Sequence, residues 1–159
     1  MLKRIGFCCK VLHEDRTLKP KQLLEYEQPM NCRGTTVRYL NEHPDIAFEK
    51  MWDVTKHNIE SVYKLVEYVG GLNDNQHMVR ISSPVLPMAT EPTWRHFWNQ
   101  SDVQTYIERE FAKVGNLARS LDVRLSFHPG QFCVLASLSD DVLNSCLLYT
   151  SDAADGRLS

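Results

Sequence analysis

The chain lacks a long apolar run. No segment approaches the roughly 20 apolar residues that a membrane-spanning helix needs. No apolar stretch of the kind found in a secretion signal follows the basic residues near its start. We therefore expect a soluble, unsecreted protein in a cytoplasmic compartment, with no membrane partner and no evident protein partner.

Paired cysteines are also lacking. The five cysteines form an odd set without a C-x-x-C pair: Cys8, Cys9, Cys32, Cys133 and Cys146. Such a set fits neither a disulfide framework nor a structural zinc site. Reduced thiols that pack as small apolar side chains are the expectation.

Neither sign of charge is in large excess. The net charge is −2, with 24% charged and 43% hydrophobic residues, as in an ordinary globular protein. This balance argues against a protein that coats nucleic acid non-specifically, although a local basic face can still bind phosphates. The 159 residues allow one modest domain, whereas a closed eight-stranded α/β barrel typically needs about 250.

Three strand-like segments alternate with two amphipathic helical segments. The strands are predicted at residues 4–9, 78–83 and from 124 onward, and the helices at 47–68 and 103–121, the second with Ser101 or Asp102 as N-cap. This order predicts an α/β fold with right-handed crossovers and a parallel sheet. Residues 11–44 are interpreted as a long polar surface loop with a function of its own.

The third strand ends in an unusual way. The apolar run from residue 124 stops abruptly at His128, which is followed by Pro129, Gly130 and Gln131. Proline cannot donate to a sheet ladder and glycine permits a sharp turn, so we expect His128 at the C-terminal edge of the sheet. Catalytic residues collect at that edge in parallel α/β folds. The alternative is a histidine that merely caps the strand by hydrogen bonding.

Taken together, four segments resemble the N-terminal part of the UV-damage endonuclease family, in its order and spacing: residues 4–7, 80–83, 86–87 and 124–132. The resemblance runs from about Lys3 to Ser145. It implies a TIM-type (β/α)8 barrel, of which residues 1–146 would be an N-terminal fragment of about three βα units. Residues 147–159 resemble translated adapter sequence, and we interpret them as a tail foreign to the family.

The resemblance also implies an activity. Members of the family use divalent metal ions, commonly manganese, to cut UV-damaged double-stranded DNA on the 5′ side of the photoproduct. His128 would be a metal ligand and the catalytic residue of this segment. Glu91 would be a second ligand, where many relatives have the histidine of Ser-His-Pro, and manganese accepts such an oxygen donor readily.

Further positions follow from the same resemblance. Gln131 and Phe132 correspond to the pair that probes the duplex at the lesion, and Phe7 occupies a tyrosine position near the site. Phe132 would keep the stacking ability of the usual tyrosine while losing its hydroxyl. Read alone, Phe132 fits an ordinary core residue and Glu91 a solvated loop carboxylate equally well.

Three basic residues flank the long loop: Lys10, Arg33 and Arg38. They could contact DNA phosphates, but solvated surface charge accounts for them as well.

Two other functions stay open. One is a metal-dependent sugar isomerase or epimerase, whose barrels also gather histidine and acidic ligands at strand ends. The other is a non-catalytic fragment, because three βα units cannot close a barrel and leave a strand edge unpaired.

Overall fold

The computed structural model describes residues 4–128 of the chain. Two predicted site residues, Gln131 and Phe132, lie outside the described residues. The predicted tail, residues 147–159, lies outside them as well.

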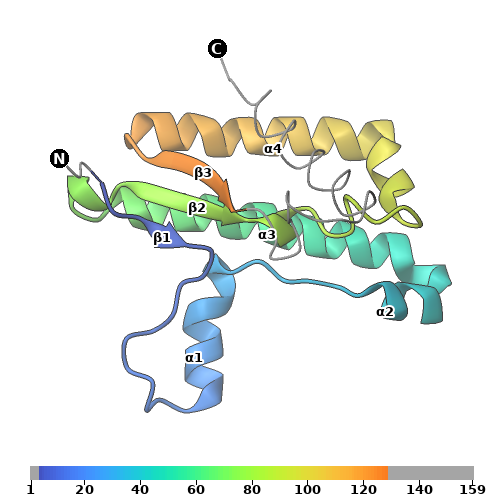
Figure 1. Cartoon of the computed structure of the whole chain (residues 1–159), viewed down its shortest axis with the longest axis horizontal. Coiled ribbons are helices and arrows are strands. Elements are labelled where there is room, and N and C mark those ends of the chain that lie inside the picture. The colour runs from blue at the N-terminus through green and yellow to red at the C-terminus, as the bar shows by residue number, and fades with distance from the viewer. Residues whose placement is uncertain (1–3, 129–159) are drawn as a thin grey trace, which may run out of the picture.

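Three parallel strands form one sheet in the order β1-β2-β3 (Figure 1). They are β1 (Phe7–Cys8), β2 (Met78–Ser82) and β3 (Arg124–His128). The predicted parallel sheet is therefore confirmed. β1 is shorter than the predicted 4–9, because Cys9 adopts a left-handed backbone conformation with φ 67° and ends the strand.

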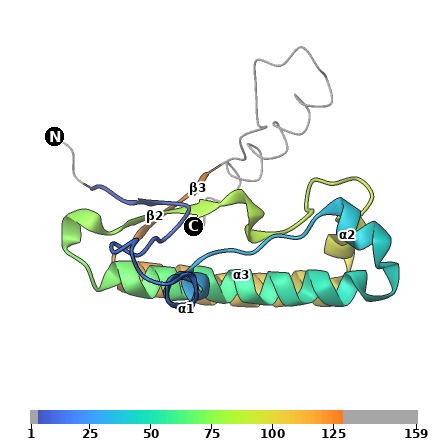
Figure 2. The same ribbon diagram turned by 90° about the horizontal axis from the view of Figure 1, so that it is seen from below.

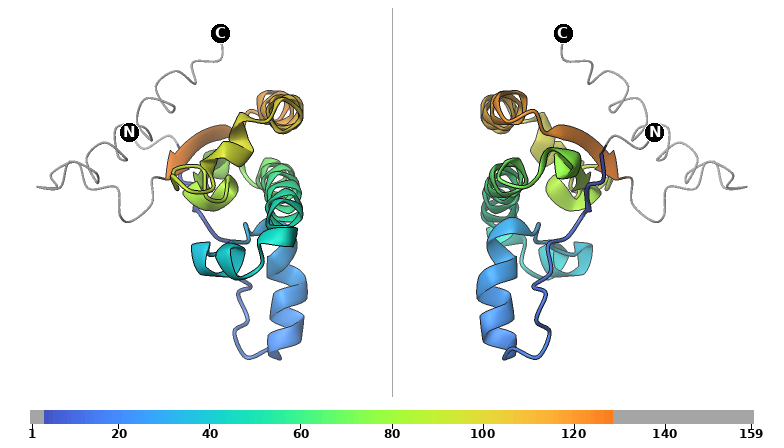
Figure 3. Two further views of the ribbon diagram at one scale, coloured as in Figure 1. Left: turned by 90° about the vertical axis from the view of Figure 1, so that its right-hand side faces the viewer. Right: turned by 90° about the vertical axis from the view of Figure 1, so that its left-hand side faces the viewer.

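Two long helices cover one face of this sheet (Figure 3). They are α3 (Ala47–Gly70) and α4 (Ser101–Ser120), as the apolar periodicity predicted. Ser101 or Asp102 was expected as N-cap, but both lie inside α4, and Gln100 occupies the cap position without a side-chain capping hydrogen bond. None of the helices within residues 4–128 is long and apolar enough to cross a membrane.

The main core lies between the sheet and the two helices. Val79 and Ile81 of β2 are buried against apolar residues of α3 and α4, whereas Arg80 between them is exposed. This alternation follows from the two-residue period of a strand. Among residues 4–128, no helix covers the face of the sheet that carries Arg80 (Figure 3).

The prediction of a loop over residues 11–44 is wrong in part. This segment contains α1 (Pro20–Glu27) and α2 (Val37–Glu42). Pro20 starts α1 in the first turn, where its missing N–H costs nothing. The Thr36 hydroxyl caps α2 by accepting from the Tyr39 N–H. Neither helix packs an apolar face into the main core, and α1 projects away from α3 and α4 (Figures 1 and 2).

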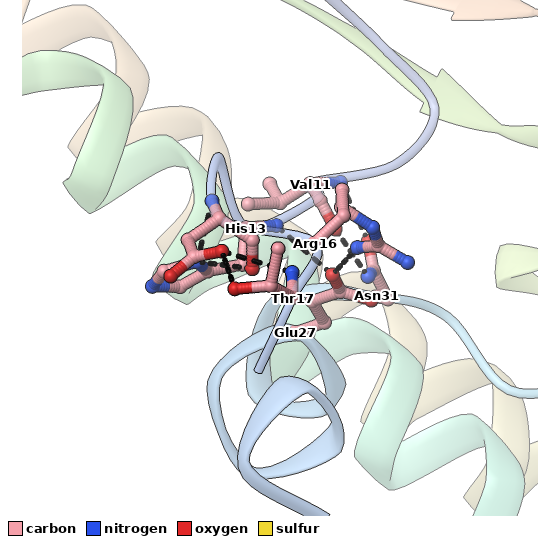
Figure 4. A network of polar contacts seen from close by, with 7 residues as sticks. Val11, His13, Arg16, Thr17, Glu27 and Asn31 are labelled. Carbon is pink, nitrogen blue, oxygen red and sulfur yellow. Dashed lines mark hydrogen bonds and ion pairs between the residues drawn. The ribbon is translucent and has the colours of Figure 1, made fainter. Parts of the chain in front are cut away.

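Polar contacts hold the start of this segment in place (Figure 4). The Asn31 side chain makes two hydrogen bonds of 2.8 Å with the backbone of Val11. The Glu27 carboxylate accepts from the His13 N–H at 2.9 Å and forms an ion pair with Arg16. These contacts join residues 11–16 to the end of α1 and the turn after it.

Short 3₁₀ helices fill the remaining connections: Gln28–Met30, Pro44–Ile46, Asp74–Gln76, Ser83–Val85 and Arg95–Asn99. The last one carries Phe97, which is fully buried at the centre of a second cluster beside the N-terminal half of α3. Aromatic rings surround it, with ring centroids 5.5 Å away for Phe48, 5.7 Å for Trp52 and 4.9 Å for Trp98. This cluster fixes the connection between β2 and α4.

Candidate functional site

The C-terminal edge of the sheet brings His128 level with the end of β2. In the β2–β3 register, His128 pairs with Ser82. Phe7 pairs with Val79, which is opposite Leu125 on the other side. Phe7 therefore lies three residues before the level of His128, or roughly 10 Å along the strand direction at the usual rise per residue.

A pocket of about 290 Å³ lies beside the C-terminal end of β2. One wall consists of Gly34 and Thr35, from the segment between α1 and α2. The other wall follows β2 directly and consists of Ser83, Pro84, Leu86, Pro87, Met88, Ala89 and Thr90. Hydroxyl-bearing and apolar side chains thus share the lining. The long segment after β1, for which the sequence predicts a function of its own, thus contributes two residues to the pocket.

Asn58 of α3 is buried between the two walls. Its side-chain oxygen accepts from the Arg33 N–H at 2.7 Å, and its side-chain nitrogen donates to Arg33 O at 3.0 Å and to Pro84 O at 2.9 Å. The apolar periodicity of residues 47–68 places Asn58 on the core face of α3, but it does not indicate a function for this residue. A polar residue at a core position of a helix is the one signal that could have drawn attention to it, since a buried amide requires partners.

Glu91 follows the last lining residue of the pocket, Thr90. Its carboxylate accepts a hydrogen bond of 3.1 Å from the Thr93 N–H, within its own turn. Its backbone oxygen accepts from the N–H groups of Trp94 and Arg95, at 3.2 and 2.8 Å. The local arrangement therefore makes Glu91 a turn-forming residue at the rim of the pocket.

The three predicted phosphate-binding residues lie in different settings. Lys10 is exposed directly after β1. Arg38 is exposed on α2 and forms an ion pair with Glu42 one turn later. Arg33 is half-buried, with Nη2 3.6 Å from Asp53 Oδ2 and with Nε buried and unpartnered among the described residues. Arg33 thus lies beside the pocket wall, while Arg38 belongs to the surface of α2.

Thiol chemistry is not favoured here. Burial raises the pKa of the Cys32 thiol to about 11, so it stays protonated near neutral pH. Cys32 is a free cysteine that packs against the main core, in agreement with the reduced thiols expected from the sequence.

Residues 4–128 contain no group of three histidine, cysteine, aspartate or glutamate side chains that could hold a metal ion. The described residues therefore do not by themselves provide a metal site. His128 and Glu91 could contribute to one only together with donors outside this range.

Comparisons with known proteins give the family. The model of the family described as "UV-endonuclease UvdE" matches residues 4–151. A UV DNA damage endonuclease of Bacillus velezensis is 32% identical over 108 residues, which cover 68% of this chain and 32% of that protein. One of Clostridium perfringens is 26% identical over 99 residues, which cover 62% of this chain and 22% of that protein.

A solved structure shares the fold. The crystal structure of SacUVDE superimposes with a TM-score of 0.61 at 22% sequence identity, over 79% of this chain and 40% of that one. The chain spans a third or less of the length of these two curated relatives. Because the family match covers nearly the whole chain, this protein belongs to the UV-endonuclease UvdE family.

Proposed function

We propose that this chain forms the N-terminal part of a UV DNA damage endonuclease, which hydrolyses the phosphodiester 5′ to UV photoproducts in double-stranded DNA. The observation that carries the proposal is the match to the UV-endonuclease family over residues 4–151. The pocket at the C-terminal edge of the parallel sheet supports it, because that edge is where such folds bind substrates.

The fold proposal is an eight-stranded TIM-type barrel of which β1, β2 and β3 are the first strands. The parallel order with α3 and α4 on one face is what a barrel segment requires. Within residues 4–128, β1 and β3 each have one edge without a partner strand. In the proposed protein, further strands would pair there and close the barrel.

His128 and Glu91 are the proposed metal ligands in this part of the protein, with Mn²⁺ as the expected ion. A neutral imidazole and a carboxylate are both donors that manganese accepts. Such ions supply a polarised water molecule and neutralise the charge that develops on the phosphate. One carboxylate oxygen of Glu91, Oε1, accepts from the Thr93 N–H, and the second oxygen could bind the ion.

Gln131 and Phe132 are proposed to test whether a base pair can be opened, with Phe7 nearby. Damaged bases are weakly stacked, so a wedge at the lesion has less energy to overcome there than at an intact pair. Selection by deformability would allow one enzyme to accept chemically different photoproducts. Lys10, Arg33 and Arg38 are proposed contacts for the DNA backbone. A cytoplasmic location belongs to the same proposal.

The experiment measures nicking of UV-irradiated plasmid with and without Mn²⁺. The 159-residue chain alone is expected to leave the plasmid intact, because it cannot supply a complete metal site. A form of the protein that carries the remaining strands of the barrel is expected to nick irradiated plasmid only with the metal. In that form, His128→Ala should abolish cutting while lesion binding is partly retained, and Gln131→Ala should weaken discrimination between damaged and intact DNA.

His43→Ala is the matched control, because His43 is exposed and the contacts of its ring among the described residues are with Tyr39, one turn earlier: it stacks on the Tyr39 ring and lies 3.0 Å from the Tyr39 backbone oxygen. It should nick like the unmodified protein. Robust, metal-dependent nicking by the 159-residue chain would contradict the fragment proposal. Unchanged kinetics in both site variants would remove the site assignment, and turnover of sugars instead of DNA would favour the isomerase.

A further inference from the structure

Asn58 is fully buried in the middle of α3. Both ends of its amide group are hydrogen-bonded: the oxygen accepts from one backbone N–H, and the two hydrogens of the nitrogen are shared among three backbone oxygens. The third of these oxygens belongs to Val85, at 3.3 Å. A buried amide is tolerated only where partners of this kind compensate for its lost hydration.

These partners belong to two segments that lie far apart in the sequence. Arg33, bound through both its N–H and its carbonyl, precedes the pocket residues Gly34 and Thr35 directly. Pro84 and Val85 belong to the stretch that follows β2 and forms the opposite wall. One side chain of a long helix therefore holds both sides of the pocket.

Neighbouring contacts strengthen the same connection on the Arg33 side. The His57 ring nitrogen Nε2 lies 3.1 Å from Asn31 O, and Asn31 in turn binds the backbone of Val11. On the other side, Asn58 donates to Pro84 O and Val85 O, and the Val85 side chain packs in the main core with apolar residues of α3. Removal of the amide would therefore loosen the polar contacts of both walls, while apolar packing still holds Val85.

The wall that Asn58 holds carries a polar atom without a partner. The Thr35 hydroxyl is buried, lines the pocket and has no hydrogen-bond partner among the described residues. At Gly34, a Cβ would meet nothing within 4 Å in the described part of the chain. This wall thus offers open space at Gly34, while the Thr35 hydroxyl is buried and unsatisfied beside it. The position of the wall decides how much of this space an occupant can use.

We propose that Asn58 is a positioning residue, which holds the Gly34–Thr35 wall and the wall after β2 at a fixed separation so that the pocket is preformed for a DNA strand. The statement that the pocket receives a DNA strand rests on the proposed endonuclease function. Asn58 itself does not line the pocket, so it acts through the backbone of Arg33 and Pro84.

The test compares Asn58→Ala with Thr55→Val. Thr55 is equally buried on the same helix, but its hydroxyl donates only to Met51 O within α3. Both variants lose a buried hydrogen bond and should lose stability. Only Asn58→Ala should speed hydrogen exchange of the Arg33 amide, by about fivefold, since that factor corresponds to the net strength of one ordinary hydrogen bond.

A second variant keeps the test decisive if Asn58→Ala fails to fold. Asn58→Asp retains an acceptor for the Arg33 N–H but cannot donate to Pro84 O. It should leave the Arg33 amide nearly as protected as in the unmodified protein, while the amides of the residues after β2 exchange faster than in the unmodified protein. An Arg33 amide that is equally protected in all variants would overturn the proposal, as would an equal acceleration by Thr55→Val.

The DNA clause is tested separately, by binding of a UV-irradiated duplex to the form that carries the remaining strands. Asn58→Ala should weaken this binding at least fivefold, and Thr55→Val should leave it unchanged. If the unmodified protein does not distinguish irradiated from intact duplex, the proposed function fails, and the exchange data still decide whether Asn58 positions the walls. If exchange at Arg33 accelerates but binding stays the same, the pocket is not where the DNA lies.

Discussion

Truncation of Phe97 should destabilise this protein strongly and should act on the connection that carries the candidate site. Phe97 is fully buried in the 3₁₀ helix between the pocket wall and α4. Its ring contacts those of Phe48, Trp52 and Trp98. Phe97→Ala therefore removes the central side chain of the second cluster and weakens the packing of residues 94–100 against α3.

The magnitude follows from burial and from how far the site can collapse. A fully buried phenylalanine replaced by alanine typically costs about 3–5 kcal/mol. Phe48, on one side of the ring, is 38% exposed, so the surrounding side chains can partly close the gap. The lower end of the range, about 3 kcal/mol, is therefore expected. This is a large part of the total stability of a small domain, which is about 5–15 kcal/mol.

Urea unfolding followed by tryptophan fluorescence measures this change. Two of the three tryptophans, Trp52 and Trp98, contact Phe97 directly, so their emission reports on the cluster. With an m-value of about 2 kcal/mol per molar, the midpoint should fall by about 1.5 M urea. The matched control is Phe48→Ala, which removes the same ring from a more exposed position and should cost about 1 kcal/mol. Equal midpoints for the two variants would refute a cluster centred on Phe97.

Two further predictions concern backbone packing and pH. Gly6→Ala should cost about 1–3 kcal/mol because of overpacking, since a Cβ there would clash with the backbone oxygen of Met78 in β2. Gly34→Ala, with open space around it, should leave the unfolding midpoint unchanged. Equal effects of the two substitutions would show that Gly6 does not approach β2 so closely. Burial raises the pKa of Cys32 to about 11 from 9.0. Because only the unfolded thiol ionises between these values, stability should fall as the pH rises through that window and stay constant below it. Alkylation followed by peptide mass spectrometry at pH 8 should label Cys32 much more slowly than a thiol in the unfolded chain, and equal rates would contradict the burial.

The strands and long helices were predictable because their signals are local and repeated. Alternating burial along β2, with Val79 and Ile81 inside and Arg80 outside, follows from a two-residue period. The apolar face of α3 extends over six turns, so a single exception such as Asn58 does not hide it. The parallel order followed from topology rules rather than from any single residue.

Residues 11–44 could not be predicted equally well, because little in them repeats. α1 has no buried residue and α2 has one, Leu40, so neither shows a long apolar stripe. What holds this segment is a set of individual polar contacts with distant partners, such as Asn31 with Val11 and Glu27 with His13. Contacts of this kind depend on the folded arrangement and leave no periodic trace in the sequence.

The candidate site depends both on a local sequence pattern and on contacts between residues far apart in the sequence. The sequence around His128 predicted that this residue lies where β3 ends. In the sheet, His128 pairs with Ser82, the last residue of β2, so the two strands end at the same edge. The pocket beside it depends on Asn58, whose partners at Arg33 and Pro84 meet only after the chain has folded. The connections after β1 and after β2 are therefore coupled through one side chain of α3. A substitution on the core face of that helix can thus change the C-terminal edge without touching any residue that lines it, and loss of activity in such a variant would not by itself assign a catalytic role.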